Sequence, residues 1–342
     1  MRIINLSSIY SGLKQSEKFQ TYRDLWKKTN YYNNLLDFPL HLDIELSGVC
    51  NLKCESCFQN SLIQGPLGFM KIDLFRKIID EGMSKGLSSI KLQVRGESLL
   101  HPELFDCIRY AKKSGVMDVQ ITTNGTLLDD KCIDEVFKSG LDAIIFSIDA
   151  HHGESCKNKF GVDTYDQAES SIKELLKLRT KLGKVKPWVR IRVSIPIVDA
   201  DSIAKTKKYI MDKFPECDIV IVGRIHNFRD DEDSFPDLHT NYIMMPCSYL
   251  MQRLTIFWNG DVTTCCMDYN NRFQLGNVQY RSIQDIWLSE KMRRFRKLHS
   301  TGRRKKMPIC KHCHACTKSA SDNTIVDTTS RHIADYNELT TT

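Results

Sequence analysis

The sequence lacks any run of 18 or more apolar residues among its 342 positions. A transmembrane helix is therefore not expected, because a spanning helix needs about 20 predominantly apolar residues. The first residues also lack the long apolar stretch of a secretory signal. We expect a cytoplasmic protein with no membrane partner, whose apolar fraction of 41% suffices for a full hydrophobic core.

Acidic residues are absent from residues 291–306, which carry nine Lys or Arg. The formal net charge of the chain is only +7, so the positive charge is local and the remainder is slightly acidic. This distribution disfavours a nucleic acid as the partner, because such proteins carry a broad basic field. The segment predicts an amphipathic helix with a solvated cationic side, whose apolar and basic faces are Met292, Phe295 and Leu298, and Arg293, Arg296 and Lys297. An anionic partner, such as the diphosphate of a nucleotide sugar, is the alternative interpretation.

Cysteine is plentiful, and six of the 13 cysteines lie in two tight groups at 50–57 and 310–316. Metal binding in a reducing compartment explains this grouping better than disulfides do. The first group is a C-x3-C-x2-C loop that supplies three thiolates and no fourth ligand, namely Cys50, Cys54 and Cys57. Thiolates favour iron–sulfur clusters or zinc, and three ligands leave a coordination position open for a small molecule. Structural zinc is the weaker alternative, because the nearest downstream histidine is His101.

Strand-like runs alternate with segments of helical periodicity between residues 40 and 225. The six predicted strands are 41–46, 90–94, 119–123, 143–148, 189–195 and 219–222. This alternation predicts an α/β fold with a parallel sheet and right-handed crossovers, either flat or curved into a barrel. In both cases reactive groups gather at the carboxyl ends of the strands, and the first cysteine loop follows the first strand.

Four parts of the chain differ in composition. Residues 1–38 predict an N-terminal helical extension, with a helix near 15–29, and residues 39–235 contain the βα units. Residues 240–316 are punctuated by Cys, Trp and Gly and form a third region. The Thr- and Ser-rich residues 317–342 predict a flexible tail.

Polar motifs follow the second, third and fourth predicted strands, at 95–102, 122–125 and 147–150. Together with the cysteine loop, this order of motifs resembles the radical S-adenosylmethionine (SAM) superfamily. The resemblance implies a partial (β/α)6 barrel and a [4Fe–4S] cluster on the first three cysteines, whose unique iron binds SAM. Reduction would then cleave SAM to a 5′-deoxyadenosyl radical, which takes a hydrogen atom from the substrate.

The same resemblance implies contacts to SAM. Gly96 and Glu97 would hold its amino group, and polar residues at strand ends would contact the rest of the cofactor, namely Thr122, Asn124 and Ser147. Phe58 would stack on the adenine, since the aromatic residue that many members place before the third cysteine is a serine here. Arg192, facing inward or outward on the fifth strand, would clamp a carboxylate of SAM or of the substrate. Arg95 departs from the family, which often has a second glycine at this position.

The second group of cysteines belongs to a longer pattern. Residues 256–262 predict a hairpin with an Asn-Gly turn, which would carry Cys247 and Cys265 toward each other. This spacing resembles the SPASM/twitch extension of radical SAM enzymes, and it is similar to that of the aminocyclitol dehydrogenase of the butirosin pathway. The resemblance implies that residues 240–316 form a small α+β domain that binds a cluster. The resemblance implies one auxiliary [4Fe–4S] cluster, held by Cys247, Cys265, Cys310 and Cys313, with Cys316 as the alternative fourth ligand. A zinc site on the last three cysteines and His312 or His314 is the other interpretation.

These resemblances imply a radical SAM oxidoreductase, and we expect it to oxidise a carbinol of a sugar or aminocyclitol, free or linked to a nucleotide. The auxiliary cluster would accept the released electron, and a base would take the hydroxyl proton, with Asp149, His226 and Asp268 as candidates. A reductant such as flavodoxin or ferredoxin would supply the electron for SAM cleavage. The alternatives are a maturase that oxidises, crosslinks or epimerises a peptide or protein, and a non-catalytic metal- or RNA-binding module around residues 291–316.

Overall fold

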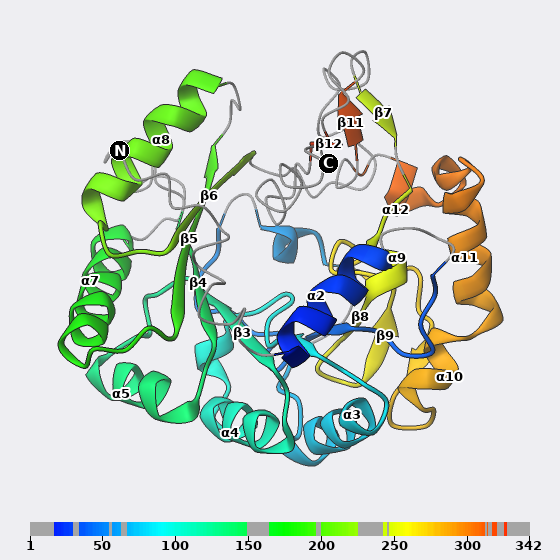
Figure 1. The fold of residues 1–342 in the computed structure, drawn as a ribbon, viewed down its shortest axis with the longest axis horizontal. Helices are drawn as coiled ribbons and strands as arrows, with labels where there is room; N and C mark the ends of the chain where they lie inside the picture. The colour runs from blue at the N-terminus through cyan, green and yellow to red at the C-terminus, as the bar shows by residue number, and fades with distance from the viewer. Residues whose placement is uncertain are drawn as a thin grey trace.

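The computed structural model describes residues 17–29, 34–54, 57–62, 67–148, 164–195, 200–224, 242–244, 246–311, 313, 317–319 and 325–326. Six parallel strands cross one sheet in chain order: β1 (His41–Ile44), β2 (Ser89–Lys91), β3 (Asp118–Thr123), β4 (Ala143–Ser147), β5 (Trp188–Ile195) and β6 (Ile219–Arg224). The helices between them are α3 (Ile72–Ser84), α4 (Leu104–Ser114), α5 (Asp130–Ser139), α7 (Tyr165–Lys181) and α8 (Ala200–Lys213). Figure 1 shows these helices along the outside of a curved sheet, which is the predicted partial (β/α)6 barrel.

The two faces of the sheet differ in chemistry, because side chains alternate along a strand. On β1, Leu42 and Ile44 are fully buried in the core that the outer helices cover. The alternate residues His41, Asp43 and Glu45 are also buried, on the inner side of the barrel. The inside of the barrel is therefore lined with charged side chains rather than filled with apolar ones.

The C-terminal region continues the same sheet instead of forming a separate one. Strand β8 (Arg253–Ile256) pairs in parallel with β1, and β9 (Asp261–Thr263) and β10 (Gly276–Asn277) follow it in antiparallel order. The predicted hairpin is confirmed, with Gly260 at a φ of +85° in the turn between β8 and β9. The predicted 240–316 region thus shares its sheet with the barrel.

Helices α9 (Tyr249–Gln252), α10 (Ile283–Trp287), α11 (Glu290–Ser300) and α12 (Pro308–Lys311) surround these strands. The predicted amphipathic helix is α11, and Met292 and Phe295 are buried on its apolar face. The placement of Arg296 on the solvated face was wrong. Arg296 is buried, because its guanidinium stacks 4.0 Å from the Trp287 ring and donates to the carbonyls of Leu250 and Trp287.

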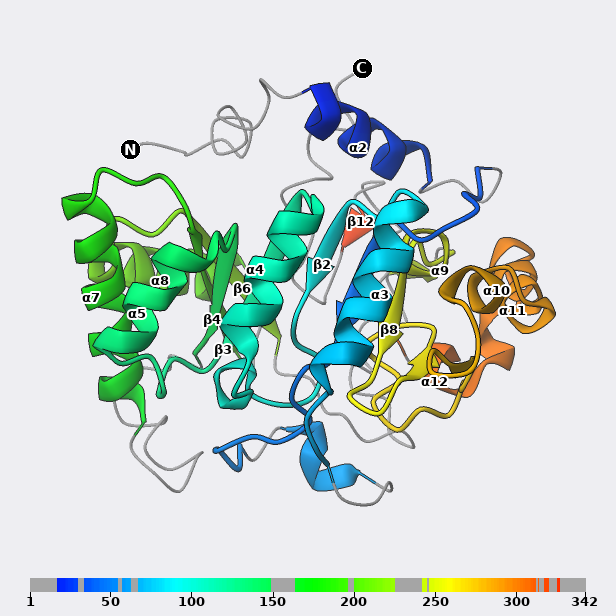
Figure 2. The same cartoon turned by 90° about the horizontal axis from the view of Figure 1, so that it is seen from below.

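The N-terminal extension closes one end of the barrel. Helix α2 (Glu17–Lys28) buries Phe19, Tyr22 and Trp26 against Leu40 at the start of the barrel. Figure 2 shows α2 at one end of the molecule and the loop after β1 at the opposite end. The open end of the barrel is therefore the one that carries the cysteine loop.

Part of the predicted flexible tail is ordered into strands. β11 (Thr317–Ser319) pairs with both β7 (Tyr242–Met244) and β12 (Ile325–Val326) in a small antiparallel sheet. The composition of the segment hid these short pairings, because they depend on a partner strand far away in the sequence. Within the described ranges, no helix has the length and apolar character that crossing a membrane requires.

A buried cluster of charges lies inside the barrel, next to α2. Asp43 pairs with Lys91 at 3.0 Å, and Arg253 lies 3.6 Å from the same carboxylate. His41 contacts Asp43 through Nε2 at 3.4 Å and Ser89 through Nδ1 at 2.8 Å. Burial lowers the pKa of His41 to about 4, and it outweighs the opposing effect of Asp43. His41 is therefore neutral in the folded protein near pH 7.

We expect this histidine to make stability depend on pH. Between pH 6.5 and about 4 the unfolded chain binds a proton at His41 that the folded chain does not. The free energy of unfolding should therefore fall as the pH is lowered through this window, by up to about 3 kcal/mol for this group. Urea denaturation from pH 7 to pH 4.5 measures the slope. Variant His41→Gln should lose the contribution of the histidine to the slope of unfolding free energy against pH. Equal slopes in both proteins would contradict the prediction.

Neighbouring charges do not supply the same slope. Burial opposes ionisation of Asp43, but Lys91 and His41 outweigh it and hold its pKa well below the usual value. In the folded protein Asp43 therefore stays ionised across the window. The comparison of wild type with His41→Gln therefore isolates the histidine.

Candidate functional site

The first cysteine loop begins directly after β1, at the open end of the barrel. Cys50 and Cys57 lie near each other, because the charge of Cys57 acts on the Cys50 thiol, and the backbone N–H of Cys57 donates to the carbonyl of Cys54 at 3.0 Å. Burial raises the pKa of both the Cys50 and the Cys57 thiols. Three soft donors on one short loop match the ligand set of an iron–sulfur cluster, whose irons would deprotonate the thiols.

Gly96 lets the loop after β2 pass against the cysteine loop. A Cβ atom on Gly96 would lie 2.3 Å from the carbonyl oxygen of Ser47 and 2.4 Å from that of Val49. The adjacent N–H of Glu97 donates to the Val49 carbonyl at 2.9 Å. Only glycine fits, because both obstacles are backbone atoms.

We expect Gly96→Ala to disrupt this junction. The added methyl group must push the two loops apart, so formation of 5′-deoxyadenosine from SAM should fall about tenfold or more, as misplacement by about 1 Å does elsewhere. Chromatography of the anaerobic reaction measures it. Gly302→Ala is the control, because a Cβ there meets no atom within 4 Å, and its φ of +69° makes the control the more strained of the two backbones. Equal loss in both variants would point to general instability instead.

Glu97 is a buried carboxylate beside the cysteine loop. Its two oxygens accept hydrogen bonds from the N–H groups of Leu99 at 3.0 Å and Asn124 at 2.8 Å. Burial raises its pKa and outweighs these hydrogen bonds. No cation forms an ion pair with Glu97 within the described part of the chain. A buried acid of this kind, which also acts electrostatically on Cys50, fits the ammonium group of SAM.

Asn124 is held by a small ring of polar side chains at the end of β3. Its Nδ2 donates to Asn51 Oδ1 at 3.0 Å, and its Oδ1 accepts from Thr126 Oγ1 at 2.7 Å. Asn51 in turn donates to Thr126 at 2.9 Å. Because Asn51 directly follows Cys50, this ring fixes the cysteine loop to the sheet. Asn51 and Thr126 were not among the predicted site residues, although Asn51 lies inside the cysteine motif and Thr126 directly follows the motif at 122–125.

The other predicted SAM contacts lie on the inner side of the barrel or near it. Thr122 is half-buried near the end of β3, and Ser147 is exposed at the end of β4. Arg192 pairs in register with Ser147, and it faces inward because its neighbours on β5 lie in the outer core. Phe58 is stacked on Tyr269, with ring centroids 5.2 Å apart. The contact of Phe58 with adenine therefore remains a prediction.

Of the three residues predicted as the catalytic base, the structure describes one, Asp268. Asp149 and His226 lie outside the described residues, as does the alternative cluster ligand Cys316. Asp268 is buried, and its carboxylate accepts hydrogen bonds from the hydroxyl of Thr263 and from the N–H groups of Arg272 and Phe273. These contacts are what a residue that shapes a loop would make, so they favour a structural role for Asp268 over proton abstraction.

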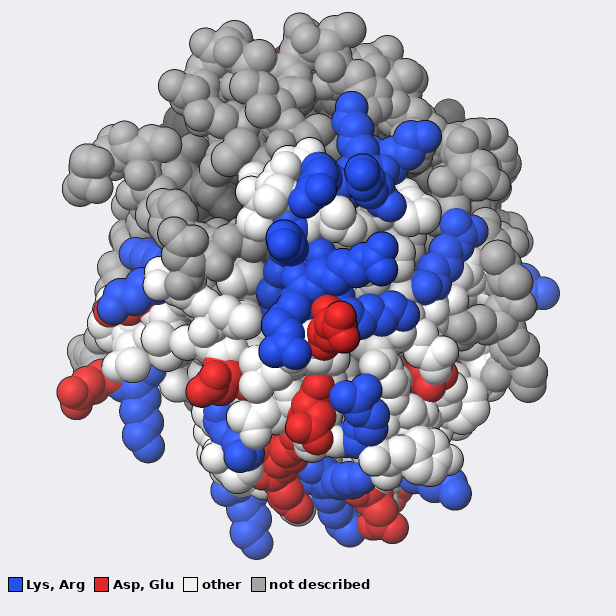
Figure 3. Space-filling view, turned by 90° about the vertical axis from the view of Figure 1, so that its right-hand side faces the viewer, with Lys and Arg blue, Asp and Glu red and all other residues white. Residues whose placement is uncertain are grey.

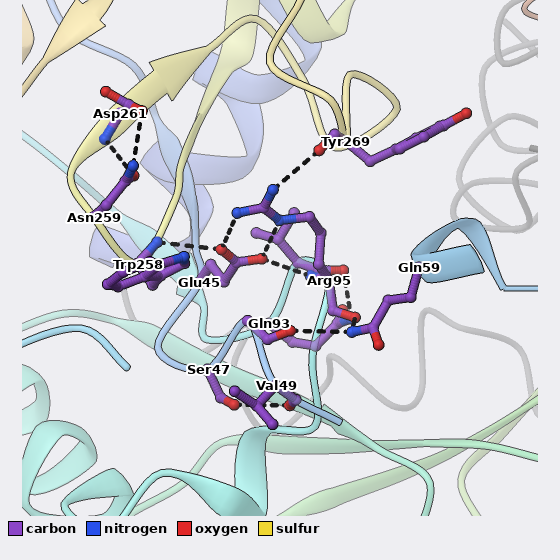
Figure 4. A network of polar contacts seen from close by, with 12 residues as sticks. Glu45, Ser47, Val49, Gln59, Gln93, Arg95, Trp258, Asn259, Asp261 and Tyr269 are labelled. Carbon is purple, nitrogen blue, oxygen red and sulfur yellow. Dashed lines mark hydrogen bonds and ion pairs between the residues drawn. The ribbon is translucent and has the colours of Figure 1, made fainter. Parts of the chain in front are cut away.

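A buried ion pair between Glu45 and Arg95 was not predicted from the sequence. Arg95 donates to both carboxylate oxygens, through Nε and Nη2, at 2.7 Å each. Its Nη1 also donates to the carbonyl of Tyr269 at 3.1 Å, and Glu45 accepts from the N–H of Trp258 at 3.2 Å. Gln59, on the cysteine loop, donates to the Arg95 carbonyl at 2.8 Å. Figure 4 shows these groups converging from the barrel, the cysteine loop and the β8–β9 region.

The second group of cysteines converges among the C-terminal elements. Burial raises the pKa of Cys265 well above its usual value, and nearby Cys266, Cys310, Cys247 and Cys313 add to the rise. Cys310 is affected in the same way by Cys313 and Cys247. In the described residues no three Cys, His, Asp or Glu side chains are arranged to hold a single metal ion. A [4Fe–4S] cluster instead binds each cysteine to a different iron, so it does not require that arrangement.

Two buried residues support this group of cysteines from α11 and the turn after it. His299 accepts the N–H of Cys247 through Nδ1 at 3.1 Å, and the 3-10 turn η4 (Arg304–Lys306) begins with a buried arginine. Arg304 donates to the carbonyls of Cys310 and Cys313. Both residues hold the backbone of the predicted cluster ligands.

Comparisons with known proteins agree with this arrangement. Residues 44–186 match the radical SAM superfamily, and residues 247–314 match the SPASM iron–sulfur cluster-binding domain. The chain is therefore a radical SAM enzyme with a SPASM domain. Its cofactors are SAM, a [4Fe–4S] cluster and an auxiliary iron–sulfur cluster in the SPASM domain.

The proteins that are similar to this chain carry the names of several different activities. The tungsten-containing aldehyde ferredoxin oxidoreductase cofactor-modifying protein of Pyrococcus furiosus is 27% identical, with 75% of this chain and 83% of the relative covered. The GTP 3′,8-cyclase of Chlorobaculum tepidum is 29% identical over 43% of either chain. Solved structures with the same fold include BtrN with AdoMet and 2-DOIA, at a TM-score of 0.55 and 18% identity, covering 84% of this chain and 96% of BtrN. Streptococcus suis SuiB bound to its precursor peptide SuiA has a TM-score of 0.59 and 16% identity, covering 83% and 70%.

Proposed function

We propose that this enzyme oxidises a carbinol carbon of a sugar or aminocyclitol. The observation that carries the proposal is the convergence of Cys247, Cys265, Cys310 and Cys313, the ligand count of one auxiliary cluster. Oxidation of a carbinol removes one hydrogen atom, one proton and one electron, so it requires a nearby electron acceptor. A single auxiliary cluster would meet this requirement. The fold shared with BtrN, solved with AdoMet and 2-DOIA, agrees with the proposal.

The residues have separate roles in this proposal. Cys50, Cys54 and Cys57 would hold the cluster that binds SAM, and Glu97 would bind the ammonium group of SAM. When bound, cluster and SAM supply the 5′-deoxyadenosyl radical that takes the hydrogen atom. Arg192 would hold a carboxylate of SAM or a polar group of the substrate. Asp149 and His226 remain the candidates for the base that takes the hydroxyl proton.

Deuterium transfer tests the proposal. Reconstituted enzyme would be incubated with SAM, dithionite and a panel of aminocyclitols and sugars that carry deuterium on the carbinol carbon. We expect one substrate to pass deuterium into 5′-deoxyadenosine and to give a carbonyl product in a one-to-one ratio. Unlabelled 5′-deoxyadenosine with every member of the panel, formed by uncoupled cleavage alone, would count against the proposal.

Modification of a peptide or protein is the second candidate. It is favoured by two proteins with this fold, SuiB bound to SuiA and anSMEcpe bound to the Cp18Cys peptide. The first has a TM-score of 0.59 and the second also 0.59. Mass spectrometry of the enzyme's substrates discriminates the two, because a maturase changes the mass of a peptide and leaves the sugar panel unchanged.

A further inference from the structure

Helix α11 presents one face to the auxiliary cysteines and the other to solvent. On the buried face, His299 contacts the backbone of Cys247, and Phe295 packs on Phe273 with ring centroids 5.0 Å apart. On the opposite face, Arg293, Arg294 and Lys297 are exposed. None of these three side chains forms a hydrogen bond or an ion pair with another residue in the described part of the chain. Their charges are therefore available to a partner.

The next turns of the chain extend this positive face. Together the exposed cations form what we name the basic surface: Lys291, Arg293, Arg294, Lys297, Arg303, Lys305, Lys306 and Lys311. Asp285 and Glu290 are the exposed acids on α10 and α11. Figure 3 shows Lys and Arg gathered on the side of the molecule where α10, α11 and α12 lie.

The basic surface lies directly over the auxiliary cysteines. Arg304 lies between its members Arg303 and Lys305, and it donates to the carbonyls of Cys310 and Cys313. Lys311 follows Cys310 in the sequence and is exposed. A partner seated here would be separated from the cysteines by little more than the thickness of α11 and η4.

We propose that the basic surface is the docking site of an acidic electron-carrier protein. The inference rests on the proposed oxidation, in which the carbinol loses one electron after it has lost a hydrogen atom and a proton. An oxidised one-electron carrier docked here would take up that electron and leave as its reduced form. Weak electron-transfer complexes of this kind depend on charge steering more than on apolar contact.

The chemistry of the surface favours an acidic protein over RNA. Single-stranded nucleic acids bind to surfaces that combine cations with exposed aromatic rings for base stacking. The aromatic residue of α11, Phe295, is buried, and no large apolar side chain is exposed on α11, η4 or α12. What remains is an array of long cationic side chains, which suits carboxylates spread over a protein surface.

Charge reversal on α11 tests the proposal. The probes are a purified acidic flavodoxin, a purified acidic ferredoxin and a single-stranded RNA oligonucleotide, each titrated calorimetrically against the reconstituted full-length enzyme. The test variant is Arg293→Glu/Arg294→Glu/Lys297→Glu. The matched control is Lys205→Glu/Lys207→Glu/Lys208→Glu on α8, which makes the same change in net charge with equally exposed residues on the far side of the barrel (Figure 1).

We expect one acidic carrier to bind the wild type and the α8 control alike, and to bind the α11 variant about tenfold or more weakly. The affinity should fall as salt is raised, because the Debye length shortens from about 10 Å at 0.1 M to 3 Å at 1 M. No binding of either carrier at low salt, equal weakening by both variants, or tight binding of the RNA alone would overturn the proposal.

A chemical reductant separates this proposal from the proposed function. Formation of 5′-deoxyadenosine with dithionite should be the same in wild type and in both variants, because dithionite needs no docking site. If dithionite-driven oxidation of every carbinol fails in the wild type, the proposed function fails. The calorimetric result still decides whether the basic surface binds an acidic carrier.

Discussion

Replacing Cys54 with Ser should abolish cleavage of SAM and remove about four of the eight irons expected for two [4Fe–4S] clusters. The same result is expected for Cys50→Ser and Cys57→Ser. A three-cysteine site has no spare ligand, and the hydroxyl of serine is a poor ligand for iron in clusters built on soft thiolates. Anaerobic reconstitution followed by iron analysis and by chromatography of 5′-deoxyadenosine measures both effects.

Two further variants sharpen this expectation. Cys265→Ser should also lose about four irons, because Cys265 is surrounded by the other auxiliary cysteines, but it should still cleave SAM with dithionite. Cys132→Ser should change neither iron content nor SAM cleavage, since Cys132 lies on α5, one of the helices along the outside of the sheet (Figure 1). Normal 5′-deoxyadenosine formation by Cys54→Ser would rule out the assignment of this loop as the SAM-binding cluster site.

Arg95→Met should lower the free energy of unfolding by about 3–5 kcal/mol. The exposed fractions of the two side chains are 2% for Arg95 and 0% for Glu45, so the substitution leaves a fully buried carboxylate without its cation. The variant also loses the hydrogen bond to the Tyr269 carbonyl and the packing of the guanidinium 4.0 Å from the Phe257 ring. Urea denaturation of the anaerobic protein measures the change.

An exposed ion pair provides the matched control. Arg109 pairs with Glu135 at 2.6 Å, but their exposed fractions are 43% and 30%, so Arg109→Met should cost less than about 1 kcal/mol. Adding Glu45→Leu to Arg95→Met should restore part of the lost stability, because the unpaired charge is then gone. A stability of Arg95→Met within about 1 kcal/mol of wild type would show that water or another cation compensates Glu45.

The regular elements could be predicted closely from the sequence, because their signals are local. The predicted strand 189–195 is observed as β5, one residue longer. Fully buried and half-buried side chains alternate along it, so the residues that face the outer helices are separated from those that face the inside of the barrel. Aspartate is a preferred N-cap residue, and Asp129 caps α5 by accepting the N–H of Cys132 at 2.7 Å. The same preference would place Asp73 at the N-cap of α3, but α3 begins at Ile72, directly after Lys71, so Asp73 lies inside its first turn.

The site could be predicted only where its residues are close in sequence. The C-x3-C-x2-C loop and the Gly-Glu pair can be recognised from the sequence, since each motif occupies a few consecutive positions. The Glu45–Arg95 pair joins residues 50 positions apart, and its partners Trp258 and Tyr269 are further still, so no short pattern records it. Arg296 was misplaced because helical periodicity treats every cation as solvated, whereas Trp287 from α10 covers this one.

The parallel pairing of β8 with β1 means that the SPASM region cannot be removed as an independent module. A protein shortened to end near residue 240 would expose the hydrogen-bonding edge of β1, where Glu45 now donates its N–H to the carbonyl of Ile256 at 2.8 Å. An uncovered strand edge recruits edges of other molecules, so such a truncated protein should aggregate. Exchange of SPASM regions between relatives would likewise succeed only when the donated strand matches the recipient's first strand, which makes this seam a constraint on how such enzymes diversify.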